Sequence, residues 1–186
     1  MNSDFRVIID ACVLVQPSVR DTVLRLSERR LFLARWSEHI ISELDRTLIR
    51  FGVARDRVDH LLSELKNHFP DAWIEPSYRD LIPKMHNEHK DRHVVAAAVQ
   101  GGCELIVTYN LKHFKQEHLQ PFDVTACHPD EFLIDLYHLN PEVVVHALHQ
   151  QGSALREKQT LTDVLERLRI ARCNRFADLI AERLSL

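Results

Sequence analysis

Two polar residues that directly follow apolar runs are the first candidates for chemistry. Asp10 comes after the β-branched run 5–9 (FRVII), and Asn110 comes just after the run 104–108 (ELIVT). Both runs read as strands, and the carboxyl ends of parallel strands meet at one edge of a sheet, where ligands bind. Two alternatives stay open: Asp10 as a turn acid or helix cap, and Asn110 as the cap of a short helix that starts at Leu111.

Asp91 is a third candidate, at the start of a helix predicted over about 90–101. An advance of ~100° per residue puts it near the centre of the apolar stripe formed by Val94, Val95 and Ala98. A carboxylate on a core-facing stripe must be paired, capped or bound to a metal. The pattern does not choose between a ligand and an N-terminal cap for this helix.

A further acid is offered by the helix predicted to run from the N-cap Ser37 to about Arg50. It carries Glu38, Glu43 and Asp45, and helical geometry does not choose among them. Glu43 and Asp45 lie on opposite flanks of the apolar stripe. Each of the three is also explained as a solvated surface acid.

Several other site types are excluded or disfavoured. The chain has no GxGxxG, no GxxxxGK[ST] and no GxSxG motif. His86, His89 and His93 have a spacing that suits a transition metal, but no Cys lies nearby, and we interpret them as surface or connector histidines. The four Cys form no CxxC pair and indicate reduced thiols of a cytoplasmic protein.

The composition is that of a soluble globular protein. The 186 residues are 45% apolar and 27% charged, with a net charge of −3, so there is no bulk basic signature of a nucleic-acid binder. Residues 20–57 nevertheless hold nine Arg against six acids, which allows a local basic face. Apolar runs are too short for a membrane span, and the N-terminal run lacks the features of a signal peptide.

The elements that must position these residues alternate between strands and helices. This order predicts an α/β fold with a parallel sheet and helices on both faces. Residues 70–84, with three prolines, are predicted as an extended connection. The tail is all helical, with Thr160 and Asn174 as predicted caps, and we divide the chain into domains 1–138 and 139–186.

Three blocks of the sequence, in order and spacing, resemble a PIN domain. They are VIIDACVLV, WSEHIISELDRTL and KDRHVVAAAVQGGCELIVTYNLKHF, and the resemblance covers about residues 5–137. The subgroup resembled is the VapC-like ribonuclease toxins of bacterial toxin–antitoxin pairs. The resemblance implies a three-layer α/β/α sandwich with a central parallel sheet, here followed by a C-terminal helical extension.

The resemblance also implies which residues carry the chemistry. It maps the catalytic positions to Asp10, Glu43, Asp91 and Asn110, and thereby selects Glu43 among the acids of its helix. The metal positions are Asp10, Glu43 and Asp91, with Glu88 as a further candidate. The chain departs from the family pattern in two places. Cys12 stands where many relatives have Asn or Ser, and the amide of Asn110 replaces an acid and lowers the ligand charge.

The implied activity is Mg²⁺- or Mn²⁺-dependent cleavage of single-stranded RNA. Both ions prefer carboxylate oxygen, and a bound ion would activate a water for attack on the phosphodiester. The implied partners are RNA and an antitoxin protein, and a homodimer stays open. One alternative is a non-catalytic PIN-like module that binds RNA or protein. A phosphotransfer domain fits less well because DACVL lacks the second acid of a DxD motif.

Overall fold

The computed structural model describes residues 4–154 and 158–185, and its contacts divide the chain into two compact units. The sheet unit comprises Phe5–Val15 and Leu33–Cys127. The helical unit comprises Asp4, Gln16–Phe32 and the described residues from His128 onward. Residues 16–32, which the sequence assigned to the first domain, thus group with the C-terminal helices. The predicted domains 1–138 and 139–186 remain a prediction.

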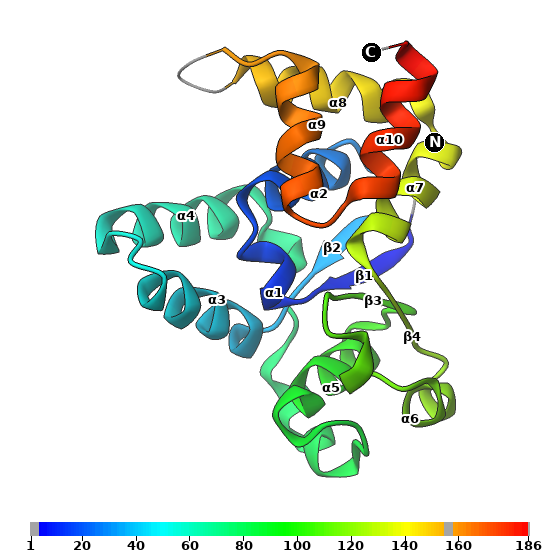
Figure 1. Ribbon diagram of the computed structural model, residues 1–186. Helices are drawn as coiled ribbons and strands as arrows, with labels where there is room; N and C mark the ends of the chain where they lie inside the picture. Colours follow the sequence, from blue (N-terminus) through cyan, green and yellow to red (C-terminus); the bar gives the residue numbers. More distant parts are fainter. Residues whose placement is uncertain (1–3, 155–157, 186) are drawn as a thin grey trace. The chain divides into compact units, whose positions relative to one another are not determined.

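Four short parallel strands form the core of the sheet unit (Figure 1). They are β1 (Arg6–Ile9), β2 (Leu33–Arg35), β3 (Leu105–Val107) and β4 (Thr125–Cys127), in the order β2-β1-β3-β4. The predicted α/β fold with a parallel sheet is therefore confirmed. Ile9 pairs in register with Val107, so the residues that follow these two strands emerge side by side at one edge.

The helices of this unit include both that the sequence predicted, over about 37–50 and 90–101, with similar bounds. They are α1 (Ala11–Leu14), α3 (Glu38–Arg50), α4 (Arg55–His68), α5 (Arg92–Gly101) and α6 (Gln116–Leu119). Ser37 caps α3 as predicted, since its hydroxyl accepts from the Ile40 N–H at 3.3 Å. Gly102 ends α5 at φ 60°, a conformation that glycine adopts without strain. In Figure 1, α3 and α4 run beside each other, and α5 packs on β1 and β3.

The expectation of an extended connection over 70–84 is wrong. The segment forms two 3₁₀ helices, η1 (Pro70–Ala72) and η2 (Pro76–Lys84), and a third, η3 (His89–Asp91), precedes α5. Proline occupies the first turn of both η1 and η2, where its fixed φ suits a helical turn and its missing N–H costs nothing. Two more 3₁₀ turns follow β3: η4 (Leu111–His113) and η5 (Gln120–Phe122).

The helical unit contains α2 (Pro17–Glu28), α7 (Pro129–Leu139), α8 (Pro141–Ser153), α9 (Leu161–Ile170) and α10 (Asn174–Leu184). Thr160 caps α9 as predicted and forms a capping box with Asp163. The predicted cap Asn174 is instead the first residue of α10, and Cys173 occupies the cap position. The tail is thus helical, as expected for a C-terminal helical extension.

The apolar faces of the tail helices are buried, and buried polar bonds join the helices of this unit. Val164, Leu168 and Phe176 are at most 1% exposed. The Thr22 hydroxyl of α2 donates to Gln151 Oε1 of α8 at 2.7 Å, and Asp130 Oδ1 of α7 accepts from the Phe176 N–H at 2.9 Å. Among the described helices, none combines the length and the apolarity needed to cross a membrane.

Candidate active site

Asp10 lies where β1 ends, and two side chains hold its carboxylate. The Thr108 hydroxyl donates to Asp10 Oδ2 at 2.6 Å, and the Cys12 thiol donates to the same oxygen at 3.1 Å. Asp10 is 4% exposed and Thr108 is fully buried. Asp10 precedes α1 but makes no side-chain cap bond, so the alternative of a helix cap is not realised. The carboxylate is held in one orientation at the edge of the sheet.

Cys12 acts here as a hydrogen-bonding group. Its sulfur accepts from the Tyr109 N–H at 3.3 Å and lies 3.4 Å from Thr108 Oγ1. Burial, and then the charge of Asp10, raises the pKa of the Cys12 thiol well above its usual value. The thiol therefore stays protonated at neutral pH and can donate to Asp10, which a thiolate could not do. Cys12 thus contributes a donor to the Asp10 carboxylate.

Asp91 lies near Asp10, and its carboxylate contacts a histidine. Asp91 Oδ2 is 2.8 Å from His113 Nδ1, although the two groups are not aligned for a hydrogen bond. Burial is the largest cause that raises the pKa of Asp91, and the charge of Asp10 comes next, whereas His113 lowers it. Asp91 makes no side-chain cap bond to α5. The structure therefore shows two acids that repel each other at one edge of the sheet.

The structure distinguishes Glu43 from the two other acids of α3. Glu43 Oε1 accepts from the ring of His93 on α5, with Nε2 at 3.2 Å. Glu38 and Asp45 instead form exposed ion pairs, Glu38 with Arg79 at 2.8 Å and Asp45 with Arg55 at 2.7 Å. Exposed pairs of this kind contribute little to stability. Glu43 is therefore the acid of α3 that faces the helix following Asp91.

His93 corrects the interpretation of the histidines as surface or connector residues. His86 and His89 are exposed, but His93 is buried and bonded to Glu43. Sequence reasoning also missed His113 and the role of Thr108. The pairs His93–Glu43 and Thr108–Asp10 are separated by 50 and 98 positions, so no local spacing connects them. The one available signal was that Thr108 and Asp10 follow neighbouring strands.

Asn110 and Glu88 are less closely tied to the two aspartates. Asn110 follows β3, and its backbone N–H donates to Thr108 Oγ1 at 3.1 Å. Its side chain makes no cap bond to η4, so the cap alternative is not realised here either. Glu88 is exposed and lines a hollow together with His113. The contacts thus join Asp91 with His113 and Glu43 with His93, while Asp10 acts on Asp91 through its charge.

The side chains at this edge of the sheet offer oxygen donors of the kind that a divalent cation prefers. Asp10 and Asp91 supply hard oxygen donors, and their mutual repulsion is what a cation would relieve. The contacts of Glu43 and Asp91 are with imidazoles. Within 4–154 and 158–185, no group of three or more His, Cys, Asp or Glu is arranged to hold a metal ion. The chemistry of the two aspartates fits such an ion, and the full ligand set stays a prediction.

Comparison with known proteins identifies two regions of the chain. Residues 4–112 match the family described as "PIN domain", and residues 129–182 match "VapC50 C-terminal domain". A relative from Mycobacterium tuberculosis (strain ATCC 25618 / H37Rv), named "Putative ribonuclease VapC50", is 54% identical over 65 residues. The aligned segment covers 35% of this chain and 38% of the relative, so it spans less than half of either protein. No solved structure matches the chain.

The first match covers more than half of the chain and contains Asp10, Glu43, Asp91 and Asn110. This PIN-domain match agrees with the parallel sheet of the structure and with the acids that lie at the edge of that sheet. The chain therefore belongs to the PIN-domain family, and its C-terminal helices match the VapC50 C-terminal domain.

Proposed function

We propose that this chain is a divalent-metal-dependent endoribonuclease that cleaves single-stranded RNA, and that it is the toxin of a toxin–antitoxin pair. One observation carries the proposal: Asp10 and Asp91 lie together at the sheet edge of a PIN-family chain, where the charge of one raises the pKa of the other. A buried carboxylate beside a second, half-buried one is costly unless a function or a cation requires the pair. The name of the relative, "Putative ribonuclease VapC50", supports the same activity.

The side chains around the two acids have assignable tasks in this proposal. Thr108 and Cys12 hold the Asp10 carboxylate in place through hydrogen bonds, and the His113 ring lies against the Asp91 carboxylate. His93 restrains the Glu43 carboxylate through its ring Nε2. Such restraint lowers the entropy lost when the acids engage a ligand.

Asp10 and Asp91 would hold Mg²⁺ or Mn²⁺, with Glu43, Asn110 and Glu88 as the further predicted ligands. When bound, the ion supplies Lewis-acid activation of the phosphate and of a water. The two carboxylates would neutralise the charge of the ion. Because Asn110 is an uncharged amide, the site would carry one negative charge fewer than a site built of acids alone. Attack of water on the phosphodiester would leave a 5′-phosphate and a 3′-hydroxyl.

The proposed setting is the cytoplasm, with RNA as substrate and an antitoxin protein as partner. A homodimer is compatible with the proposal. The competing function is a non-catalytic PIN-like module, and two observations favour it: the amide at position 110 and the imidazole partners of Glu43 and Asp91.

A cleavage assay separates the two functions. Purified full-length protein is incubated with end-labelled single-stranded RNA and Mg²⁺ or Mn²⁺, beside Asp10→Asn, Asp91→Asn and the surface control Asp45→Asn. We expect cleavage by the unaltered chain and by the control, none by the two site variants, and none in EDTA. Equal cleavage by all variants would place the nuclease activity elsewhere. RNA binding without any cleavage would support the non-catalytic module.

A further inference from the structure

A polar hollow of about 340 Å³ lies beside the candidate active site, within the sheet unit. Residues 86–89 form one wall and residues of 112–118 form the other. The lining contains four histidines, two lysines, Asn87 and a single acid, Glu88. The volume lies at the small end of the range for ligand sites, ~300–1,000 Å³, and suits a group of about nucleotide size.

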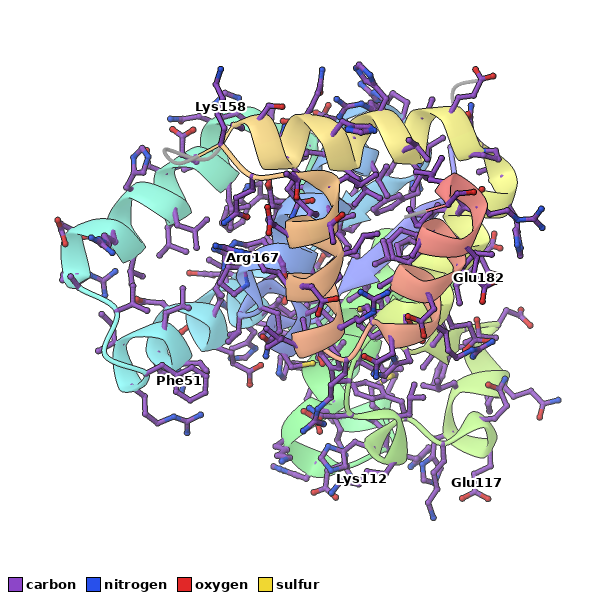
Figure 2. All side chains as sticks on the ribbon, turned by 45° about the horizontal axis from the view of Figure 1, so that its top comes forward. Phe51, Lys112, Glu117, Lys158, Arg167 and Glu182 are labelled. Carbon is purple, nitrogen blue, oxygen red and sulfur yellow. The ribbon has the colours of Figure 1, made fainter. Side chains whose placement is uncertain are left out.

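The charge of the lining favours an anion. Lys112 and Lys115 are both exposed, and Figure 2 marks Lys112 and the nearby Glu117 on the sheet unit. Lys115 Nζ lies 3.8 Å from Glu117 Oε1, an exposed pair that holds the lysine only weakly. The four histidines are not arranged to hold a metal ion, since the described residues contain no such group. His113 lies against Asp91 and His118 lies 3.7 Å from Glu117, whereas His86 and His89 are exposed and can stack on or hydrogen-bond a ligand.

Asn87 provides an independent sign of a ligand. It is 3% exposed, and neither the nitrogen nor the oxygen of its side-chain amide has a hydrogen-bond partner among the described residues. A buried polar group without a partner has lost its hydration without a compensating hydrogen bond, so it destabilises the folded chain. Groups of this kind in native proteins usually have an explanation such as an absent ligand or water. A ligand seated in the hollow could supply the partner.

His113 connects the hollow to the candidate active site. Its ring lines the hollow, and its Nδ1 lies 2.8 Å from Asp91 Oδ2. An anion held by Lys112 and Lys115 would therefore lie close to the acids. A nucleic-acid strand, with its regularly spaced phosphates, could occupy the hollow and the site of the two acids at once, whereas a single phosphate could not.

We propose that this hollow binds the nucleotide next to the cleaved bond of the RNA. Lys112 and Lys115 contact its phosphate, and the Asn87 amide hydrogen-bonds its base or ribose. The inference rests on the proposed function and adds to it a substrate subsite with named residues.

The test measures binding of a fluorescein-labelled single-stranded RNA by anisotropy at several salt concentrations. An Asp10→Asn background in Mg²⁺ prevents cleavage during the measurement. The test variant carries Lys112→Gln and Lys115→Gln, and the matched control carries Lys66→Gln and Lys84→Gln, two exposed lysines of the same unit. Each phosphate contact to a single strand contributes ~0.7 to the slope of log K against log salt.

Because both lysines contact one phosphate, we expect the test variant to lower this slope by ~0.7, which is a loss of roughly 5-fold in affinity at 0.1 M salt. The control should keep the original slope. A thermal melt of each variant checks that it is folded. An unchanged slope in a test variant that still binds RNA would overturn the inference, while cleavage by the unaltered chain would leave the proposed function standing. Absence of both RNA binding and cleavage in every form would overturn both.

Asn87→Leu gives a second measurement that does not depend on charge. If the amide finds its partner only in RNA, the variant loses an unsatisfied polar group, so it should melt no lower than the parent without RNA. It should also bind the RNA more weakly. A variant that melts lower and binds RNA with unchanged affinity would show that Asn87 has only a structural role, contrary to the inference.

Discussion

Replacing Thr108 by valine tests whether the hydroxyl of Thr108 holds the Asp10 carboxylate. Valine keeps the branched shape, so the change removes the hydroxyl with little effect on packing. The lost bond joins a neutral donor to a carboxylate across 2.6 Å, between residues that are 0% and 4% exposed. Hydrogen bonds to charged groups contribute about 1.5–3 kcal/mol. The Asn110 N–H also loses its acceptor on Thr108.

We therefore expect Thr108→Val to lower the free energy of unfolding by ~2–3 kcal/mol at pH 7. In a chain of this size, this corresponds to a fall in Tm of roughly 5–10 °C. Urea denaturation in EDTA measures the free energy without a contribution from divalent ions. Thr108→Ser is the matched control, because it keeps the hydroxyl and loses one methyl group, at a cost of about 1 kcal/mol.

A double-mutant cycle with Asp10→Asn isolates the interaction between the two side chains. In the Asn background the bond is between neutral groups, so Thr108→Val should cost only ~0.5–1.5 kcal/mol. The difference between the backgrounds, about 1 kcal/mol or more, is the coupling energy. If Thr108→Val costs the same in both backgrounds, the hydroxyl does not hold the carboxylate and the reasoning is wrong.

Three further predictions concern Asp91, Asn110 and the C-terminal helices. The raised pKa of Asp91 means that the folded state binds this proton more tightly than the unfolded chain. The charged carboxylate therefore destabilises the fold at pH 7, and this cost falls as pH drops through the raised pKa and is gone below the unfolded value of ~4. Asp91→Asn should therefore raise the urea midpoint over that of the parent at pH 7 in EDTA, and this gain should disappear near pH 3; a gain that grows in acid would contradict the assignment. Asn110→Asp should tighten Mn²⁺ binding in calorimetry because it adds a charged oxygen ligand, and equal or weaker affinity would show that residue 110 is not a ligand. Truncation after Asn140 removes α8, α9 and α10, which pack on α2 and α7 in the helical unit. The apolar surface of α2 and α7 is then exposed, so thermal melts should show a lower Tm or light scattering should show aggregation. A monodisperse truncated form as stable as the full chain would contradict this prediction.

Local sequence patterns determined the type and order of most elements. The β-branched runs before Asp10 and Asn110 are strands, and the apolar stripe that begins at Val94 is buried on α5. Ser37 and Thr160 cap helices where the sequence predicted caps. These features are readable because capping and amphipathic periodicity act within a few residues. The PIN resemblance then supplied the family, which the comparison confirmed.

Other features depended on surroundings that the local sequence does not contain. The prolines of 70–84 ruled out a regular α-helix there, but proline geometry suits both an extended segment and the 3₁₀ turns found. Residues 16–32 lie between two strands of the sheet in sequence, yet they pack with the C-terminal helices. The choice of packing partner for the apolar face of α2 depends on all the helices that are present, and not on the sequence of α2 alone.

The candidate site shows most clearly the difference between what the local sequence determines and what the tertiary packing decides. The sequence identified Asp10 and Asp91 from their places at a strand end and at a helix start. It could not rank the acids of α3 by geometry, and it interpreted His93 as a surface or connector residue. Glu43 differs from Glu38 and Asp45 only because the rotation of α3 turns it toward His93 of α5, 50 positions away. Likewise, Thr108 reaches Asp10 because Ile9 and Val107 pair in the sheet. Register and helix rotation are properties of the packed chain, and they alone decide which distant side chains meet.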